Sequence, residues 1–132
     1  MNRAVISVGS NIDPFSNIVK AVKLLGQIVN ILAQAPQVKT KPIGILNQRD
    51  FINGAFLIET SMAQTALKDQ LKEIEKQLGR VKQVEKFGPR TIDLDIAVWN
   101  GQIVDKDFYE RDFLRDAILI LWPDLKREGN KE

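Results

Sequence analysis

The pattern of apolar and polar positions predicts alternating strands and helices. The apolar, β-rich run Ala4–Val8 predicts a buried first strand, which closes at a Gly-Ser-Asn turn. Apolar residues then recur at helical spacing, and Asp13 or Ser16 is a candidate cap for that helix. We expect the helix to end between Val29 and Leu32, because an Ala-Pro pair follows.

Two strands and a second helix are predicted next. Residues 37–41 predict a short strand, and residues 51–59 predict a longer one that alternates between two faces. An amphipathic helix follows, capped by Thr60 or Ser61, and Gly79 suits its C-terminal end.

The stretch that begins as a loop at Phe87 and continues to Val98 carries the most specific pattern. From Thr91 onward the residues alternate, so Asp93, Asp95 and Ala97 are expected on one face of a strand. The opposite face is then aliphatic and consists of Ile92, Leu94, Ile96 and Val98.

The remainder of the chain predicts a hairpin and a closing helix. Asn100-Gly101 is a strong two-residue hairpin turn, and residues 102–104 form the return strand. Residues 108–122 fit a final helix that covers the sheet, although residues 118–121 taken alone fit a strand equally well.

This order of elements predicts an α+β fold. Strand, helix, strand, strand, helix and strand, followed by a hairpin strand and a terminal helix, fit a ferredoxin-like antiparallel sheet with helices packed on one face. The other face is then available to a ligand. We expect one domain over residues 1–125 and a polar tail over residues 126–132.

Composition restricts the chemistry. The 132 residues are 44% hydrophobic and 27% charged, which is typical of a globular chain, and no apolar run approaches the ~20 residues that span a bilayer. The chain has no cysteine and no histidine, so thiolate zinc sites, histidine ligands and a histidine base are excluded. The net charge of +2 is too small to argue for nucleic acid. We therefore expect a cytoplasmic monomer without a nucleic-acid or membrane partner.

The two aspartates predict either a metal site or an acidic surface. Their spacing places two carboxylates roughly 6.6 Å apart on one strand face, and magnesium usually takes one or two carboxylates plus phosphate oxygens. The loop before the strand is rich in cations: Arg80, Lys82, Lys86 and Arg90. These cations either neutralise the aspartates at the surface or hold a polyphosphate that magnesium bridges to Asp93 and Asp95.

Several segments resemble one enzyme family, the 6-hydroxymethyl-7,8-dihydropterin pyrophosphokinases. The most specific is Gly-Pro-Arg-Thr-Ile-Asp-Leu-Asp-Ile at residues 88–96. Residues 8–11, 50–54, 57–60 and 121–123 are similar to that family in the same order, as are Glu75 and the pair Gly79-Arg80.

The resemblance implies a ferredoxin-like transferase that moves pyrophosphate from ATP to a reduced pterin in folate biosynthesis. By the same resemblance, Asp93 and Asp95 hold two Mg²⁺ ions with ATP, and Arg80, Arg90 and Asp95 are the catalytic residues. The expected ATP contacts are Glu75, Arg80, Lys82, Lys86, Arg90, Arg111 and Arg115. The expected pterin contacts are Thr40, Ile43, Gly44, Phe51, Asn53 and Phe87.

The last third departs from the family pattern. The histidine of that pattern is absent, Ala117 stands where an arginine is expected, and Leu119 stands where a second pterin-stacking phenylalanine is expected. Arg111 or Arg115 could supply the lost positive charge. Two alternatives therefore remain: a pseudoenzyme or nucleotide- or pterin-binding protein of the same fold, and, less favoured, an RNA-binding module of ferredoxin-like type.

Overall fold

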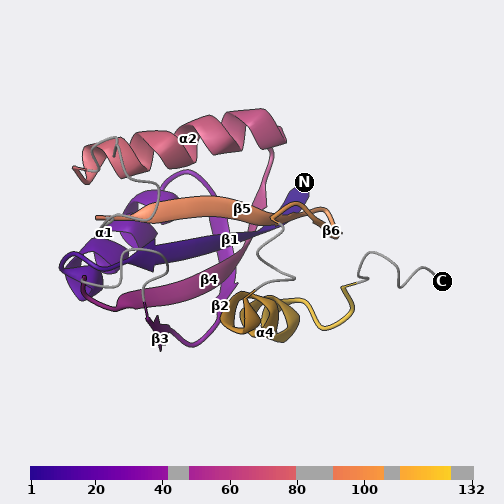
Figure 1. Cartoon of the computed structure of the whole chain (residues 1–132). Helices are drawn as coiled ribbons and strands as arrows, with labels where there is room; N and C mark the ends of the chain where they lie inside the picture. The colour runs from indigo at the N-terminus through magenta and orange to yellow at the C-terminus, as the bar shows by residue number, and fades with distance from the viewer. Residues whose placement is uncertain (42–47, 80–90, 106–110, 126–132) are drawn as a thin grey trace.

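A computed structural model describes residues 1–41, 48–79, 91–105 and 111–125 (Figure 1). The elements in chain order are β1 (Asn2–Ser10), α1 (Pro14–Gly26), β2 (Asn30–Gln34), β3 (Val38–Thr40), β4 (Phe51–Thr60), α2 (Gln64–Gln77), β5 (Asp93–Trp99), β6 (Gln102–Ile103) and α4 (Asp112–Leu121). No helix in these ranges is long and apolar enough to cross a membrane.

The strands form one antiparallel sheet with β1 at its centre. The order is β2-β4-β1-β5-β6, and β3 pairs with the part of β4 that β2 leaves open. β1 therefore pairs with β4 on one side and with β5 on the other. The predicted antiparallel α+β fold is confirmed.

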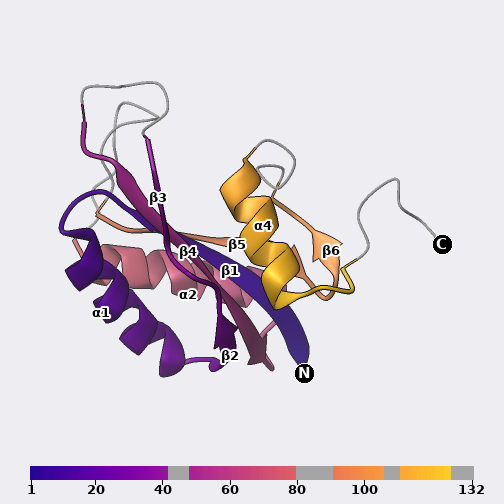
Figure 2. The same cartoon turned by 90° about the horizontal axis from the view of Figure 1, so that it is seen from below.

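The helices divide between the two faces of the sheet. α1 and α2 cover one face, where a core cluster joins Leu25 and Leu71 to Ile6 and Ile58. α4 lies on the opposite face, which Figure 2 shows with α4 nearer the viewer and α2 beyond the sheet. There α4 packs on a second cluster that includes Val5. The predicted helix layer is present, and the terminal helix adds partial cover to the second face.

The first helix is shorter than predicted, and a strand was missed after it. α1 ends at Gly26, and residues 30–34 form β2, where helix was expected to continue to between Val29 and Leu32. Hydrogen bonds of the 3₁₀ type close the last turn, such as the bond from Ile28 N to Leu25 O at 3.0 Å. Ile28 and Val29 reach the core from this turn, so their apolar spacing imitated a helix.

The alternation predicted for the aspartate strand holds up to Ile96 and then changes. β5 pairs Ile96 with Ile6 and Val98 with Val5, so Ala97 is an extra residue in a β-bulge. Ile92 and Leu94 enter the cluster under α1 and α2, whereas Ala97 and Val98 enter the cluster under α4. The prediction that Val98 shares a face with Ile92 was therefore wrong.

Neither predicted side-chain cap is formed at the helix starts. Asp13 occupies the N-cap position of α1 in a left-handed conformation without a side-chain bond, and Ala63, not Thr60 or Ser61, is the N-cap of α2. The Thr60 hydroxyl instead accepts a hydrogen bond from the Met62 amide at 3.1 Å, which shapes the turn before α2.

The helix end predicted at Gly79 and the hairpin turn predicted at Asn100-Gly101 are both confirmed. Gly79 follows α2 with φ of 89°, as expected for a helix C-terminus. Asn100 and Gly101 both have positive φ, 49° and 87°, and join β5 to β6 as the predicted two-residue turn.

Candidate active site

The centre of the candidate site is a row of three residues across the sheet. Gly9 on β1 is paired with Asn53 on β4 at one side and with Asp93 on β5 at the other. Residues that are directly opposite each other share a face, so all three belong to the face that α4 partly covers. Two strand spacings separate Asn53 from Asp93, which is roughly 10 Å between their Cα atoms.

Gly9 has no side chain, which allows the Asn53 carboxamide to approach the backbone of β1 closely. A Cβ atom at Gly9 would lie 3.1 Å from Asn53 Oδ1 and 3.9 Å from Phe51 Cδ1. The first distance is shorter than normal van der Waals contact, so the Asn53 carboxamide lies directly over the glycine. We refer to the surface over Gly9, with the Asn53 amide on one side and the Asp93 carboxylate on the other, as the groove.

The second aspartate lies in the adjacent row. Asp95 is paired with Ser7, which in turn faces Ala55, and β5 directs Asp93 and Asp95 to the same face. Asp95 is exposed and Asp93 is half-buried. No group of three or more His, Cys, Asp or Glu side chains suited to a metal occurs in the described ranges. A carboxylate pair alone fits Mg²⁺, which completes its shell with phosphate oxygens and water.

Asn53 is held in place by the neighbouring strand. Its Nδ2 donates to Thr40 Oγ1 at 2.6 Å and lies 3.4 Å from Val38 O on β3. Thr40 is paired with Phe51, so three predicted pterin contacts, Thr40, Phe51 and Asn53, are brought together on β3 and β4. The side chain of Asn53 is only 8% exposed, and its fixed orientation leaves Oδ1 over Gly9.

Glu75 on α2 forms a buried hydrogen bond to the backbone of the aspartate strand β5. It is 6% exposed on α2, and its Oε2 accepts a hydrogen bond of 2.7 Å from the backbone amide of Leu94. Leu94 lies between Asp93 and Asp95, so this bond fixes the strand between the two carboxylates. The contact with nucleotide predicted for Glu75 stays a prediction.

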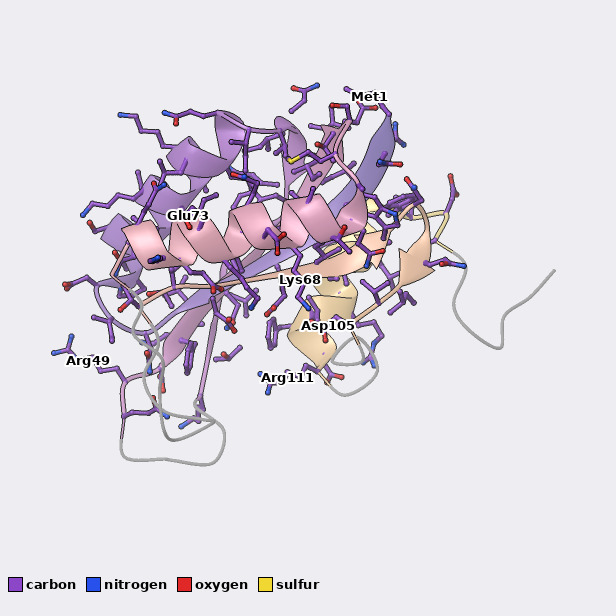
Figure 3. The ribbon with its side chains drawn as sticks, turned by 90° about the horizontal axis from the view of Figure 1, so that it is seen from above. Met1, Arg49, Lys68, Glu73, Asp105 and Arg111 are labelled. Carbon is purple, nitrogen blue, oxygen red and sulfur yellow. The ribbon has the colours of Figure 1, made fainter. Side chains whose placement is uncertain are left out.

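We expect Glu75→Ala to lower the free energy of unfolding by roughly 1.5–3 kcal/mol, the cost typical of losing a hydrogen bond to a charged group. Urea denaturation followed by circular dichroism measures this. Glu73→Ala is the matched control, because Glu73 is exposed on the same helix (Figure 3). Equal destabilisation by the two variants would show that the Glu75–Leu94 bond contributes nothing.

A pocket of about 360 Å³ lies at the open edge of β5, beside Asp95. α2 forms one wall, and the segment after β6 forms the other, held by Val104 N and Asp105 N donating to Ala97 O. Lys68 and Asp105 both line it and lie near each other in Figure 3. The full lining is Gln64, Lys68, Leu71, Lys72, Leu94, Asp95, Ile96, Val104 and Asp105.

The arginines proposed to replace lost ATP contacts lie at the start of α4. Arg115 forms an ion pair with Asp112 one turn earlier, at 2.5 Å, and Arg111 is the N-cap residue of the helix. Figure 3 shows Arg111 on the same side of the molecule as Asp105. Ala117, at the expected arginine position, is 8% exposed and packs in the cluster under α4, so here that position belongs to the core.

Seven predicted site residues lie outside the described ranges. Ile43, Gly44 and Phe87 are expected at the pterin, and Arg80, Lys82, Lys86 and Arg90 are expected at the ATP phosphates. Their roles stay predictions.

Comparison with known proteins identifies the family. A family model described as 7,8-dihydro-6-hydroxymethylpterin-pyrophosphokinase (HPPK) matches residues 5–123 of the 132. The chain belongs to the HPPK family.

Curated HPPK relatives support the assignment over most of the chain. The 2-amino-4-hydroxy-6-hydroxymethyldihydropteridine pyrophosphokinase of Haemophilus influenzae is 34% identical over 110 residues, covering 81% of this chain and 68% of that protein. Its namesake from Bacillus subtilis is 33% identical and covers 97% of this chain and 83% of that protein. Folic acid synthesis protein fol1 of Schizosaccharomyces pombe is 35% identical over 92% of this chain, which spans only 18% of that longer protein.

Three residues that the structure places in the row or on the pocket wall were not among the predicted site residues. Gly9 was interpreted as part of a turn and of a segment similar to the family, with no role in the site, because its place between Asn53 and Asp93 depends on the strand register. Lys68 and Lys72 were assigned to a solvated helix face, although their spacing of four places both on the wall of the pocket. A pair of lysines one turn apart on the helix before the aspartate strand was the available signal.

Proposed function

We propose that the chain transfers pyrophosphate from ATP to the hydroxymethyl group of 6-hydroxymethyl-7,8-dihydropterin, in folate biosynthesis. The observation that carries this proposal is the row Asn53–Gly9–Asp93. It provides an amide suited to a heterocycle edge and a carboxylate suited to a metal–phosphate complex, on either side of a glycine. Membership of the HPPK family supplies the chemistry.

The pterin is proposed to lie on the β4 side of the groove. The Asn53 carboxamide can both donate to and accept from a heterocycle edge, and Phe51 is half-buried beside it. The bond from Asn53 Nδ2 to Thr40 fixes this amide before substrate arrives. The hydroxymethyl group is then directed across Gly9 toward β5.

The adenosine of ATP is proposed to occupy the pocket at the edge of β5. Leu71 and Ile96 offer apolar surface to a purine, and Lys72 offers a positive charge. The Leu94 amide points to this edge, as its bond to Glu75 shows. Ile96 lies two residues further along, so alternation directs its backbone amide to the same edge. Asp95 lies at the rim, where the triphosphate would leave the pocket.

The reaction requires positioning more than covalent chemistry. The pterin hydroxymethyl oxygen attacks the β-phosphorus of ATP, the bond from that phosphorus to the oxygen bridging to the α-phosphorus breaks, and AMP leaves. The hydroxyl proton passes to solvent. Asp93 and Asp95 would hold two Mg²⁺ ions, which neutralise phosphate charge when bound. Arg80, Lys82, Lys86 and Arg90 are proposed to contact the phosphates, and the chain is proposed to act as a monomer.

Direct assay of the products tests this function. The purified chain with ATP, Mg²⁺ and 6-hydroxymethyl-7,8-dihydropterin should produce AMP and the pterin pyrophosphate in equal amounts. Omitting either the pterin or Mg²⁺, with chelator present, should abolish AMP formation. No AMP above the background of the chain-free mixture would contradict the proposal.

A second candidate function is binding without efficient transfer. It is favoured by the absence of histidine and by the burial of Ala117 in the core, where the family pattern has an arginine. Titration calorimetry with the pterin and a non-hydrolysable ATP analogue separates the two functions. Saturable binding of both ligands without AMP formation from ATP would establish the binding protein, and AMP formation would exclude it.

A further inference from the structure

The turn after β1 connects the two halves of the candidate site. Ser10 and Asn11 follow Gly9 directly, and both are buried, at 0% and 2% exposure. Polar side chains buried to this degree are held by hydrogen bonds. Their partners lie on two different segments, one entering β4 and one entering β5.

Asn11 holds the segment that enters β4. Its Nδ2 donates to Gln48 Oε1 at 2.8 Å and to the backbone carbonyl of Arg49 at 3.0 Å, which uses both of its amide protons. Arg49 lies two residues before Phe51 and four before Asn53. The Asn11 bonds therefore fix the backbone immediately before the proposed pterin contacts.

Ser10 holds the segment that enters β5. Its Oγ lies 2.5 Å from the carbonyl oxygen of Thr91 and 3.1 Å from that of Ile12. A hydroxyl has one proton, so the shorter contact, to Thr91, is the stronger bond. Thr91 lies two residues before Asp93. The Ser10 bond therefore fixes the start of the strand that carries the proposed metal ligands.

We propose that Ser10 and Asn11 are positioning residues that set the distance and register between the pterin half and the metal half of the site. Adjacent residues bond to both entering segments, so a shift of either segment is resisted from the same point of β1. Neither side chain needs to touch substrate. This inference rests on the proposed function, since it assigns the two halves their ligands.

We call the bonds from Ser10 and Asn11 to the two entering segments the clamp. Hydrogen exchange tests it independently of catalysis. Asn11→Ala should accelerate amide exchange in residues 48–53 and leave residues 56–60 of the same strand unchanged. Ser10→Ala should accelerate exchange in residues 91–94. Asn2→Ala is the matched control, because Asn2 Nδ2 donates to the Met62 carbonyl at 2.7 Å from the opposite end of β1. It should change neither window.

Kinetics tests whether the clamp matters for the reaction. Asn11→Ala should raise KM for the pterin about tenfold and leave KM for ATP within about twofold, because misplacement of one half affects one ligand. Ser10→Ala should raise the Mg²⁺ concentration for half-maximal rate about fivefold and leave KM for the pterin within about twofold. Gln48 is half-buried, and Gln48→Ala removes one of the two bonds of Asn11. It should accelerate amide exchange in residues 48–53 and raise KM for the pterin, each by less than Asn11→Ala does.

The outcomes separate the two proposals. Unchanged exchange in both windows, or acceleration spread evenly along β1 and β4, overturns the clamp. The clamp is also overturned if Asn11→Ala and Asn2→Ala raise KM for the pterin and KM for ATP to the same extent, because that result indicates general destabilisation. If the unmodified chain forms no AMP, the proposed function fails, and the exchange windows still decide whether Ser10 and Asn11 fix the two segments.

Discussion

Asp95→Ala will lower kcat by about 10³-fold or more and leave the fold intact, because Asp95 is proposed to hold the Mg²⁺ that neutralises phosphate charge in the reaction. Asp95 is exposed, and both its strand pairing with Ser7 and the contact from the Ser7 hydroxyl use the Asp95 backbone, so alanine preserves β5. Initial rates of AMP formation at saturating substrates measure the loss, and thermal unfolding confirms the fold.

Asp69→Ala is the control for removing a carboxylate. Asp69 is exposed on α2 and does not line the pocket, so its removal should leave kcat within about twofold, as for most surface substitutions. Raising Mg²⁺ should not restore Asp95→Ala, since the missing group is a ligand. A folded Asp95→Ala protein with kcat within tenfold of the unmodified chain would show that Asp95 is not a metal ligand in the reaction.

Gly9→Val will raise KM for the pterin by about 100-fold or more, because it fills the groove between Asn53 and Asp93. Its Cβ would already lie 3.1 Å from Asn53 Oδ1, and Asn53 cannot easily move while Thr40 holds its amide nitrogen. Valine suits an extended strand, so β1 should still form. Fluorescence titration of the pterin together with KM determination gives the result.

Gly54→Ala is the matched glycine control. Gly54 pairs with Val8 in the adjacent register position, and a Cβ there would lie 3.3 Å from Val8 Cγ1, on the side of the sheet that packs against α1 and α2. This crowding should reduce stability and leave KM for the pterin within about twofold, because it does not enter the groove. If Gly54→Ala impairs pterin binding as strongly as Gly9→Val, the groove over Gly9 is not the pterin site.

Elements with a local cause could be predicted from the sequence, and those set by tertiary contacts could not. The Asn100-Gly101 hairpin depends on two adjacent residues that accept positive φ, so its pattern was sufficient. The strand over residues 30–34 was missed because pairing of Ile31 with Ile58 stabilises it, and Ile28 and Val29 imitate a helical face. The bulge at Ala97 arises from pairing with β1 and has no local signal.

The same distinction applies to the site. Alternation alone placed Asp93 and Asp95 on one face, and the register confirms this. The contact of Asn53 with the pterin came from the family resemblance and stays a prediction. The sequence could not show that Gly9 lies between Asn53 and Asp93, because that juxtaposition requires the register of three strands. It also could not show that Ala117 packs into the core, since a helix pattern does not reveal which neighbour covers each side.

In the proposed reaction, both terminal phosphates of ATP pass together to a pterin at this groove. The most direct test uses ATP labelled at the β-phosphate. This ATP is incubated with the unmodified chain, Mg²⁺ and 6-hydroxymethyl-7,8-dihydropterin, and the products are then separated. The label should leave with the pterin, and the nucleotide product should be unlabelled AMP. Label recovered in ADP, or retained entirely in ATP while both substrates are bound, would contradict it.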